Sequence, residues 1–216
     1  MENTISSLEV QNNNQNRINV YLDGEFAFSL ARIVAVWLEV GQSISEEMIS
    51  KLQVADMVET AYQKSIKYIS YRPRTTDEIR KRLEINNTPP EIINTVIEQL
   101  REKKLVDDHQ FAEFWVENRL AFRPKSRRVI RMELRQKGVE DEIIEHVFQD
   151  IEGEEEIALK AGLKYLHRIK PVDRHIFKQR MGGYLARKGF TLETIGNVLP
   201  GLWESYSAEL NPITNG

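Results

Sequence analysis

The sequence repeats itself at a spacing of 51 residues. The stretch SYRPRTTDEIRKRLEINN at residues 70–87 returns as AFRPKSRRVIRMELRQKG at residues 121–138. Five positions also keep their character in a third copy: Ile79, Ile130 and Met181; Leu83, Leu134 and Leu185; Asn87, Gly138 and Gly189; Glu91, Glu142 and Glu193; Val96, Val147 and Val198. Self-similarity at a fixed period of this size is typical of repeat arrays. The sequence therefore predicts three copies of one structural unit.

Each copy has the pattern of three helices. An Arg-Pro or Lys-Pro step ends the first helix, because the residue before proline is disfavoured in the α region. The second helix is expected to start after an N-cap at Thr75, Ser126 or Asp173, and to end where a residue that tolerates positive φ follows, at Asn87, Gly138 or Gly189. The third copy has four extra residues between its proline and Met181, so its second helix is expected to be one turn longer.

The first 55 residues have a different pattern. Short apolar alternations in LEV, RINVYL and FAFSL, with Asp23-Gly24 between the last two, predict a three-stranded antiparallel meander. A helix is expected over about 31–40, closed by Gly41, with a short helix after Ser45.

The predicted fold is mainly α, with three tandem three-helix repeats in an elongated array after a small β-meander and helix. The expected boundaries are an N-terminal extension at 1–55, repeats at 56–105, 106–153 and 154–206, and a frayed tail at 207–216.

Charge is strongly segregated, although the net charge is only −3. Residues 119–137 hold eight basic residues against Glu133, residues 140–156 hold nine acids and no Lys or Arg, and residues 164–188 hold eight basic residues against Asp173. The second helix of the middle copy should present a basic stripe beside its apolar face. We expect that replacing Arg127, Arg128 and Arg131 in this stripe costs little stability.

No catalytic or metal-binding pattern stands out, so we expect neither an enzyme nor a bound cofactor or metal. The four histidines lack ligand spacing, and Gly182-Gly183 is not followed by the Lys-Ser/Thr of a phosphate loop. The chain has no cysteine, no apolar run long enough to cross a membrane, and no signal-peptide pattern, which together fit a cytoplasmic protein.

The remaining candidates for function lie on the surface. A basic stripe suits either nucleic-acid phosphates or an acidic protein groove. The aromatics Tyr68, Tyr71, Trp115, Phe122 and Tyr184 fall mainly at core spacing, so we interpret them as packing residues and not as base-stacking platforms. A protein regulator and a plain DNA- or RNA-binding helical module therefore both remain open.

The chain resembles the RecX family, the regulators of the RecA recombinase. The resemblance covers essentially the whole chain, and it rests on YISYRPRTTDEIRKRL, LVDDHQFAEFWVENRLAFRPKSRRVIRMELRQKGV and YLARKGFTLETIGNVL in this order. The N-terminal RINVYLDGEFAFSL is similar to the extension of longer members. The third copy departs most, with HRIKPVDRHIF at its corner.

The resemblance implies a monomeric, non-enzymatic protein that binds RecA or its nucleoprotein filament and modulates its ATPase, strand-exchange and coprotease activities. Such a role belongs to DNA repair, recombination and the SOS response, with possible contacts to the DNA backbone inside the filament. The residues expected to bind the partner are Arg72, Arg74, Arg123, Lys125, Arg127, Arg128, Arg131, Arg135, Lys137, Arg174 and Lys178. A stand-alone helical-repeat module for DNA or RNA is the alternative.

Overall fold

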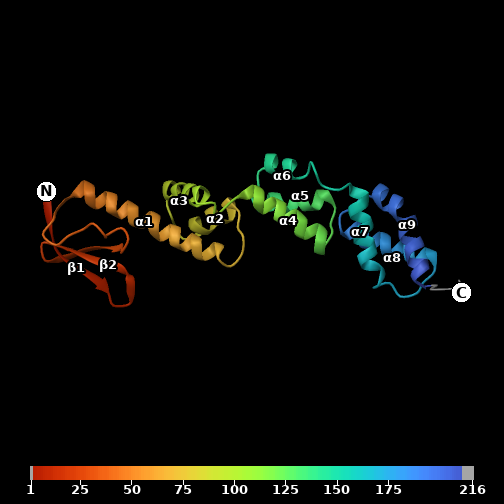
Figure 1. The fold of residues 1–216 in the computed structure, drawn as a ribbon, viewed down its shortest axis with the longest axis horizontal. Coiled ribbons are helices and arrows are strands. Elements are labelled where there is room, and N and C mark those ends of the chain that lie inside the picture. Colours follow the sequence, from red (N-terminus) through yellow and green to blue (C-terminus); the bar gives the residue numbers. More distant parts are fainter. Residues whose placement is uncertain (1, 211–216) are drawn as a thin grey trace. The chain divides into compact units, whose positions relative to one another are not determined.

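The computed structural model describes residues 2–210 (Figure 1). In chain order the elements are β1 (Glu2–Gln11), β2 (Asn14–Leu22), β3 (Glu25–Ala31), β4 (Ser43–Ser45), α1 (Glu46–Ile69), α2 (Thr76–Ile85), α3 (Pro90–Glu102), α4 (Asp108–Phe122), α5 (Arg127–Gln136), α6 (Asp141–Val147), α7 (Glu154–Leu166), α8 (Arg174–Arg187) and α9 (Leu192–Leu210). They group into two compact units, residues 1–107 and 108–216. The expected tail at 207–216 falls partly in α9, and residues 211–216 lie outside the described part.

The N-terminal sheet is antiparallel, with the strand order β3-β2-β1-β4. The predicted three-strand meander is confirmed, and β4 adds a short fourth strand beside the start of β1. Asp23 and Gly24 both have positive φ, of 50° and 92°, as a tight two-residue hairpin turn requires. Ile5, Val20 and Leu30 from the three long strands are fully buried and form the centre of this small core.

The predicted helix over 31–40 is wrong, because these residues form a series of turns. Only Ala35 and Leu38 of the segment are buried against the sheet. Ile33, Val34, Val36 and Val40 are β-branched, and such side chains are poor helix formers. Anchoring of Ala35 and Leu38 in the core therefore decides the local conformation. Gly41 does have positive φ, of 90°, where the segment closes.

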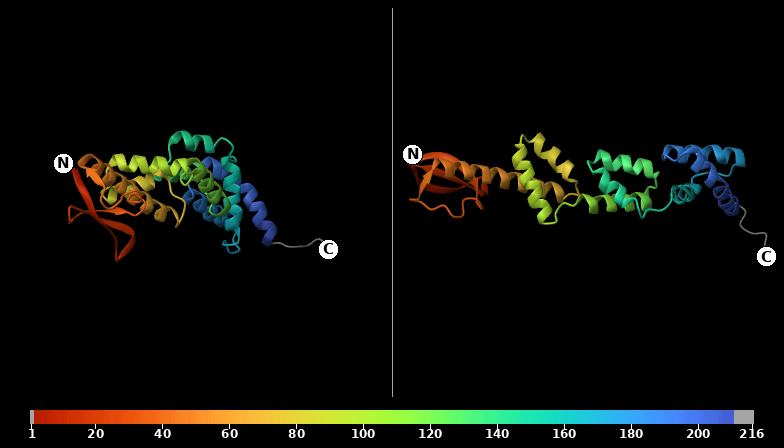
Figure 2. Two further views of the ribbon diagram at one scale, coloured as in Figure 1. Left: turned by 60° about the vertical axis from the view of Figure 1, so that its left-hand side comes forward. Right: turned by 90° about the horizontal axis from the view of Figure 1, so that it is seen from above.

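The short helix expected after Ser45 is in fact the start of a 24-residue helix, α1. Ser45 caps it by accepting a hydrogen bond from the Met48 amide at 3.2 Å, and no Gly or Pro interrupts it before Ile69. Its C-terminal half is the first helix of repeat 1, so the expected boundary at residue 55 lies within one continuous helix. Figures 1 and 2 show α1 running from the sheet to the side of α2 and α3.

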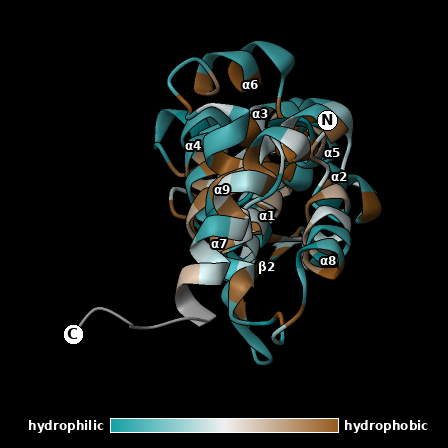
Figure 3. Ribbon diagram, turned by 90° about the vertical axis from the view of Figure 1, so that its right-hand side faces the viewer, coloured by the Kyte–Doolittle hydropathy of each residue, from teal (hydrophilic) through white to brown (hydrophobic). Residues whose placement is uncertain are grey.

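The three copies follow the predicted three-helix plan, with α1–α3, α4–α6 and α7–α9. Residues at equivalent positions of the 51-residue repeat are buried in every copy. At most 1% of the surface is exposed at two such sets: Ile79, Ile130 and Met181, and Leu83, Leu134 and Leu185. Hydrophobic and hydrophilic residues alternate along the helical ribbons, as a one-sided core requires (Figure 3). The 51-residue period thus repeats the core as well as the sequence.

The predicted helix ends are confirmed. The side chains of Thr75 and Ser126 each accept a hydrogen bond from the amide three residues on, and Asp173 accepts two, from His175 and Ile176. Asn87, Gly138 and Gly189 have φ of 56°, 75° and 92° after their helices. Helix α8 has 14 residues where α2 and α5 have 10, which is the expected extra turn.

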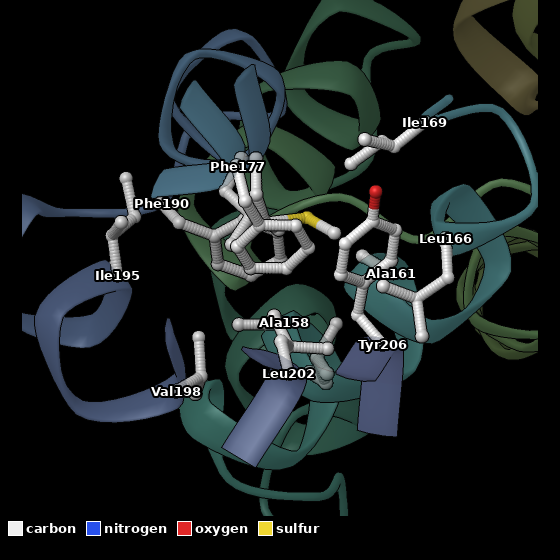
Figure 4. Packing of buried hydrophobic residues seen from close by; sticks show 13 residues of the cluster. Ala158, Ala161, Leu166, Ile169, Phe177, Phe190, Ile195, Val198, Leu202 and Tyr206 are labelled. Atoms are coloured by element: carbon white, nitrogen blue, oxygen red, sulfur yellow. The ribbon is translucent and has the colours of Figure 1, made fainter. Parts of the chain in front are cut away.

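The core of the third copy is rich in aromatic residues. Figure 4 shows Phe177 of α8 and Leu202 and Tyr206 of α9 gathered with the small residues Ala158 and Ala161 of α7. The small residues allow α9 to approach α7 closely. At Gly162 on α7 an added Cβ would lie 2.4 Å from a methyl carbon of Leu202. Gly182 and Gly183 on α8 show no comparable approach, since an added Cβ there would meet nothing nearer than 3.4 Å.

The second and third copies are joined by backbone contacts within the second unit. The amide of Ser126 donates to the carbonyl of Lys188 at 3.0 Å, so the corner before α5 pairs with the end of α8. The next amide, of Arg127, donates to the carboxylate of Glu154 at the start of α7. Gly189 packs against Val129 and Ser126 without room for a side chain. This junction fixes where the basic residues of the two copies meet.

Candidate partner-binding surface

Most arginines of the basic stripe predicted on α5 form ion pairs or hydrogen bonds within the same repeat. The guanidinium of Arg131 forms a two-pronged ion pair with Glu145, both bonds at 2.9 Å, and Arg135 pairs with Asp141 at 2.6 Å. Arg128 is exposed and has no ion pair with any residue from 2 to 210. Only part of the stripe is therefore free for a partner.

Arg127 has a structural role that the neighbouring Arg128 lacks. Its guanidinium donates to the carbonyls of Phe148, Ile151 and Glu152, at 2.8, 3.3 and 3.3 Å. These carbonyls lie just after α6, where a helix leaves acceptors unpaired. The expectation that Arg127 can be replaced at little cost therefore no longer holds.

Replacing Arg127 with Ala is expected to lower the free energy of unfolding of the second unit by about 2 kcal/mol, because three acceptors lose a charged donor. The adjacent Arg128→Ala variant is a matched control and should change it by less than about 0.5 kcal/mol. Urea unfolding followed by the fluorescence of Trp115 and Trp203 measures this difference. Equal stabilities for the two variants would contradict the assigned role of Arg127.

The carboxylate of Glu133 is the electrostatic centre of the second repeat. It accepts hydrogen bonds from Arg119 at 2.6 Å, from the Trp115 indole at 2.9 Å, and from Lys125. Burial acts to raise the pKa of Glu133, but the bonds from Lys125, Arg119 and Trp115 outweigh it and hold the pKa below its ordinary value. The single acid within the basic block thus binds together two of its cations.

Because its pKa is lowered in the folded state, Glu133 stabilises the fold above its unfolded pKa, and this contribution is lost as pH falls through the folded pKa. Glu133→Gln should lower the unfolding free energy by about 2 kcal/mol at pH 7. The difference from wild type should shrink as pH falls below about 4. Urea unfolding at several pH values tests this, and a difference that stays constant with pH would contradict it.

The other predicted binding residues have varied surroundings. Arg72 pairs with Glu78 at 2.9 Å, and the guanidinium carbon of Arg74 lies 3.9 Å from the centre of the Tyr68 ring. Lys137 lies over Trp115, at 4.6 Å from the ring centre. Arg174 and Lys178 are exposed on α8 and have no ion pair among the described residues.

A group of four cations, three of which have no carboxylate partner among residues 2–210, forms where the second and third copies meet. The pKa of Lys188 is lowered, first by burial and then by the charges of Lys125, Arg123 and Arg168, so each of these three cations lies near Lys188. Within residues 2–210, Arg123, Arg168 and Lys188 form no ion pair. We call these four residues the junction cluster. Like charges held together in this way repel one another and attract an anionic partner.

Aromatic side chains accompany the junction cluster. Phe122, directly before Arg123, is 74% exposed, and Tyr71 at the same register of the first copy is 72% exposed. The interpretation of these two residues as core is therefore wrong, because both lie at the end of the first helix of their repeats, beyond the buried stripe. Tyr184 is partly buried, and its ring stacks on Tyr165 with centres 3.9 Å apart. Exposed aromatics beside cations are common at binding hot spots.

Sequence reasoning did not include Arg168 and Lys188 among the candidate binding residues. A signal for Lys188 was present, because it lies 51 residues after Lys137 in the repeat register. Arg168 precedes the irregular corner of the third copy and has no equivalent cation in the second. The packing of the end of α8 against the corner before α5 brings Lys188, which Arg168 also approaches, near Arg123.

Two further observations concern metal binding and membrane spanning by the described residues. The rings of His109 and His146 lie close, with Nε2 and Nδ1 3.0 Å apart, but residues 2–210 contain no group of three or more side chains suited to hold a metal ion. Within the same range, no helix has the length and apolar character needed to cross a bilayer.

Four family models match the chain along its length. They are the regulatory protein RecX N-terminal domain at residues 3–45 and the first, second and third three-helix domains of RecX at 61–100, 107–147 and 153–199. These matches follow the division of the structure into a sheet and three helical repeats.

Similar curated proteins and solved structures agree with these family matches. A Regulatory protein RecX from Bacillus pumilus is 32% identical over 95% of this chain and 80% of its own, and one from Bacillus subtilis is 31% identical over 88% and 74%. A crystal structure of regulatory protein RecX superposes with a TM-score of 0.69 at 31% identity, covering 91% of this chain and 98% of that one. RecX from Lactobacillus salivarius, at 24% identity and a TM-score of 0.60 over 69% of this chain and 99% of that one, shares the fold.

Proposed function

The chain belongs to the RecX family of regulatory proteins, and from this premise we propose that it binds the RecA recombinase or its nucleoprotein filament and inhibits it. The activities restrained would be ATP hydrolysis, strand exchange and coprotease function, in cytoplasmic DNA repair, recombination and the SOS response. The chain would act as a monomer, without a catalytic centre or cofactor of its own.

The observation that carries this proposal on the molecule itself is the junction cluster. Arg123 and Arg168 both lie near Lys188, and none of the three has a carboxylate partner among residues 2–210, which costs stability that a binding surface can recover. An acidic face of RecA, or the phosphates of DNA within its filament, would relieve this repulsion. The exposed ring of Phe122 beside the cluster supplies apolar contact area.

The direct functional test is the ATPase rate of RecA on single-stranded DNA with increasing amounts of this chain. We expect the rate to fall as the chain is added and the DNA strand-exchange yield to fall with it. An unchanged ATPase rate, with the chain shown to be folded by circular dichroism, would remove inhibition from the proposed function.

A stand-alone DNA- or RNA-binding module is the second candidate, favoured by the same cations and by the exposed rings of Tyr71 and Phe122. Binding of this kind depends mainly on phosphates, so its affinity falls steeply with salt. Affinity for bare DNA that equals affinity for the filament would support this candidate over a RecA regulator.

A further inference from the structure

The N-terminal unit carries a groove that has no part in the function proposed above. It has a volume of about 890 Å³, within the range of sites that hold ligands, and it lies where the start of β2 and the end of β3 meet the C-terminal half of α1. We propose that this groove binds an extended, acidic segment of a protein partner through apolar side chains of that segment.

Exposed apolar side chains are the first support. In the turn segment after β3, Ile33, Val36, Trp37 and Val40 are 65%, 69%, 74% and 63% exposed. Ile33 and Val36 line the groove, and the other two follow directly in the segment. Four large apolar side chains exposed within eight residues are characteristic of an interaction site.

The charge of the groove is the second support, and it indicates the sign of the charge on the segment that binds there. Arg32, Lys64 and Lys67 line the groove, and none of them forms an ion pair with a described residue. Among the described residues that line the groove, Glu59 is the single acid, and it accepts a hydrogen bond from Gln63. Arg17 is already held by Asp56 at 2.9 Å. The unpaired charge at the groove is therefore positive and complementary to a carboxylate-rich segment.

The polar lining favours a polypeptide over a membrane or a nucleic acid. Asn14, Asn16 and Gln63 present amide groups, which both donate and accept hydrogen bonds as a peptide backbone requires. A lipid surface would need a protruding apolar face, whereas these groups line a concave one. The aromatic ring nearest in sequence, Trp37, does not line the groove, so no base-stacking platform faces it.

The test uses the full chain and three fluorescein-labelled peptides of about twelve residues. One alternates Glu and Leu, one has Lys in place of Glu, and one has Ser in place of Leu. Fluorescence anisotropy should show binding of the Glu-Leu peptide at least about tenfold tighter than of the other two, because only it matches both the charge and the apolar contacts.

Variants then locate the site. The double variant Lys64→Glu, Lys67→Glu should bind the Glu-Leu peptide at least about tenfold more weakly than the wild type and the Lys-Leu peptide more tightly. Ile33→Ser should bind both peptides more weakly. Lys51→Glu, on the same helix but outside the groove, is the control and should leave binding unchanged. All of these residues except Ile33 are exposed helix positions, and thermal melting checks that each variant folds.

Three results would overturn the proposal. The first is equal affinity of the wild-type chain for the three peptides. The second is a loss of affinity for the Glu-Leu peptide in the Lys51→Glu control as large as in the double variant at Lys64 and Lys67. The third is binding of phosphatidylglycerol vesicles or single-stranded DNA that the groove variants abolish while peptide binding is absent. Since none of these measurements contains RecA, their failure leaves the proposed regulatory function untouched.

Discussion

Charge reversal at both Arg123 and Arg168 is expected to weaken binding to a RecA–DNA filament about hundredfold, since like charges placed across an interface cost several kcal/mol. Both side chains belong to the junction cluster and have no ion pair among residues 2–210 that the substitutions would break. The unfolding free energy should stay the same or rise, because reversal relieves repulsion on Lys188. Titration of labelled chain with preassembled filament measures the affinity.

Arg101→Glu is the matched control for this double variant. Arg101 is also an exposed arginine near the end of a helix, α3, but it belongs to the first unit and not to the junction cluster. It should bind the filament like the wild type. If the double variant is folded and binds with unchanged affinity, the junction cluster is not the surface that meets the partner.

The largest expected loss of stability comes from Gly189→Ala. The residue has φ of +92°, and an added Cβ would lie 2.3 Å from a methyl carbon of Val129 and 2.6 Å from the hydroxyl of Ser126. Backbone strain and overpacking together should lower the unfolding free energy by about 3 kcal/mol. The clash also displaces the hydroxyl that caps α5. Urea unfolding of the second unit, followed by Trp115 and Trp203, measures the loss.

The Gly41→Ala variant separates the effect of backbone strain from the effect of overpacking. Gly41 has nearly the same backbone conformation, with φ of +90°, but nothing lies within 4 Å of an added Cβ. Its variant should lose only about 1 kcal/mol, from strain alone. Equal losses at Gly41 and Gly189 would mean that the contact between the second and third copies contributes little.

The repeated helical plan was predictable because local signals and the core agree in every copy. Thr75, Ser126 and Asp173 cap the second helices, and the glycines and Asn87 end them, since these roles depend on the residue itself and its near neighbours. Segment 31–40 was not predictable in this way. There the sheet core holds Ala35 and Leu38 and overrides the apparent helical pattern.

The binding surface was predictable only in outline. The basic blocks were visible, but helical spacing alone could not show that Arg127 binds carbonyls after α6, or that Arg131 and Arg135 pair with acids of the following helix. The approach of Arg123 to Lys188 depends on contacts between two repeats. Sequence spacing within one helix carries no information about such contacts.

The most direct test of the account compares the affinity of the chain for a RecA–single-stranded DNA filament with its affinity for the same DNA alone. Anisotropy of the labelled chain, measured between about 50 and 200 mM salt, gives both affinities and their salt dependence. The account predicts binding to the filament at least about tenfold tighter than to bare DNA throughout this range. Equal affinities that fall together with salt would contradict it and identify the chain as a DNA-binding module.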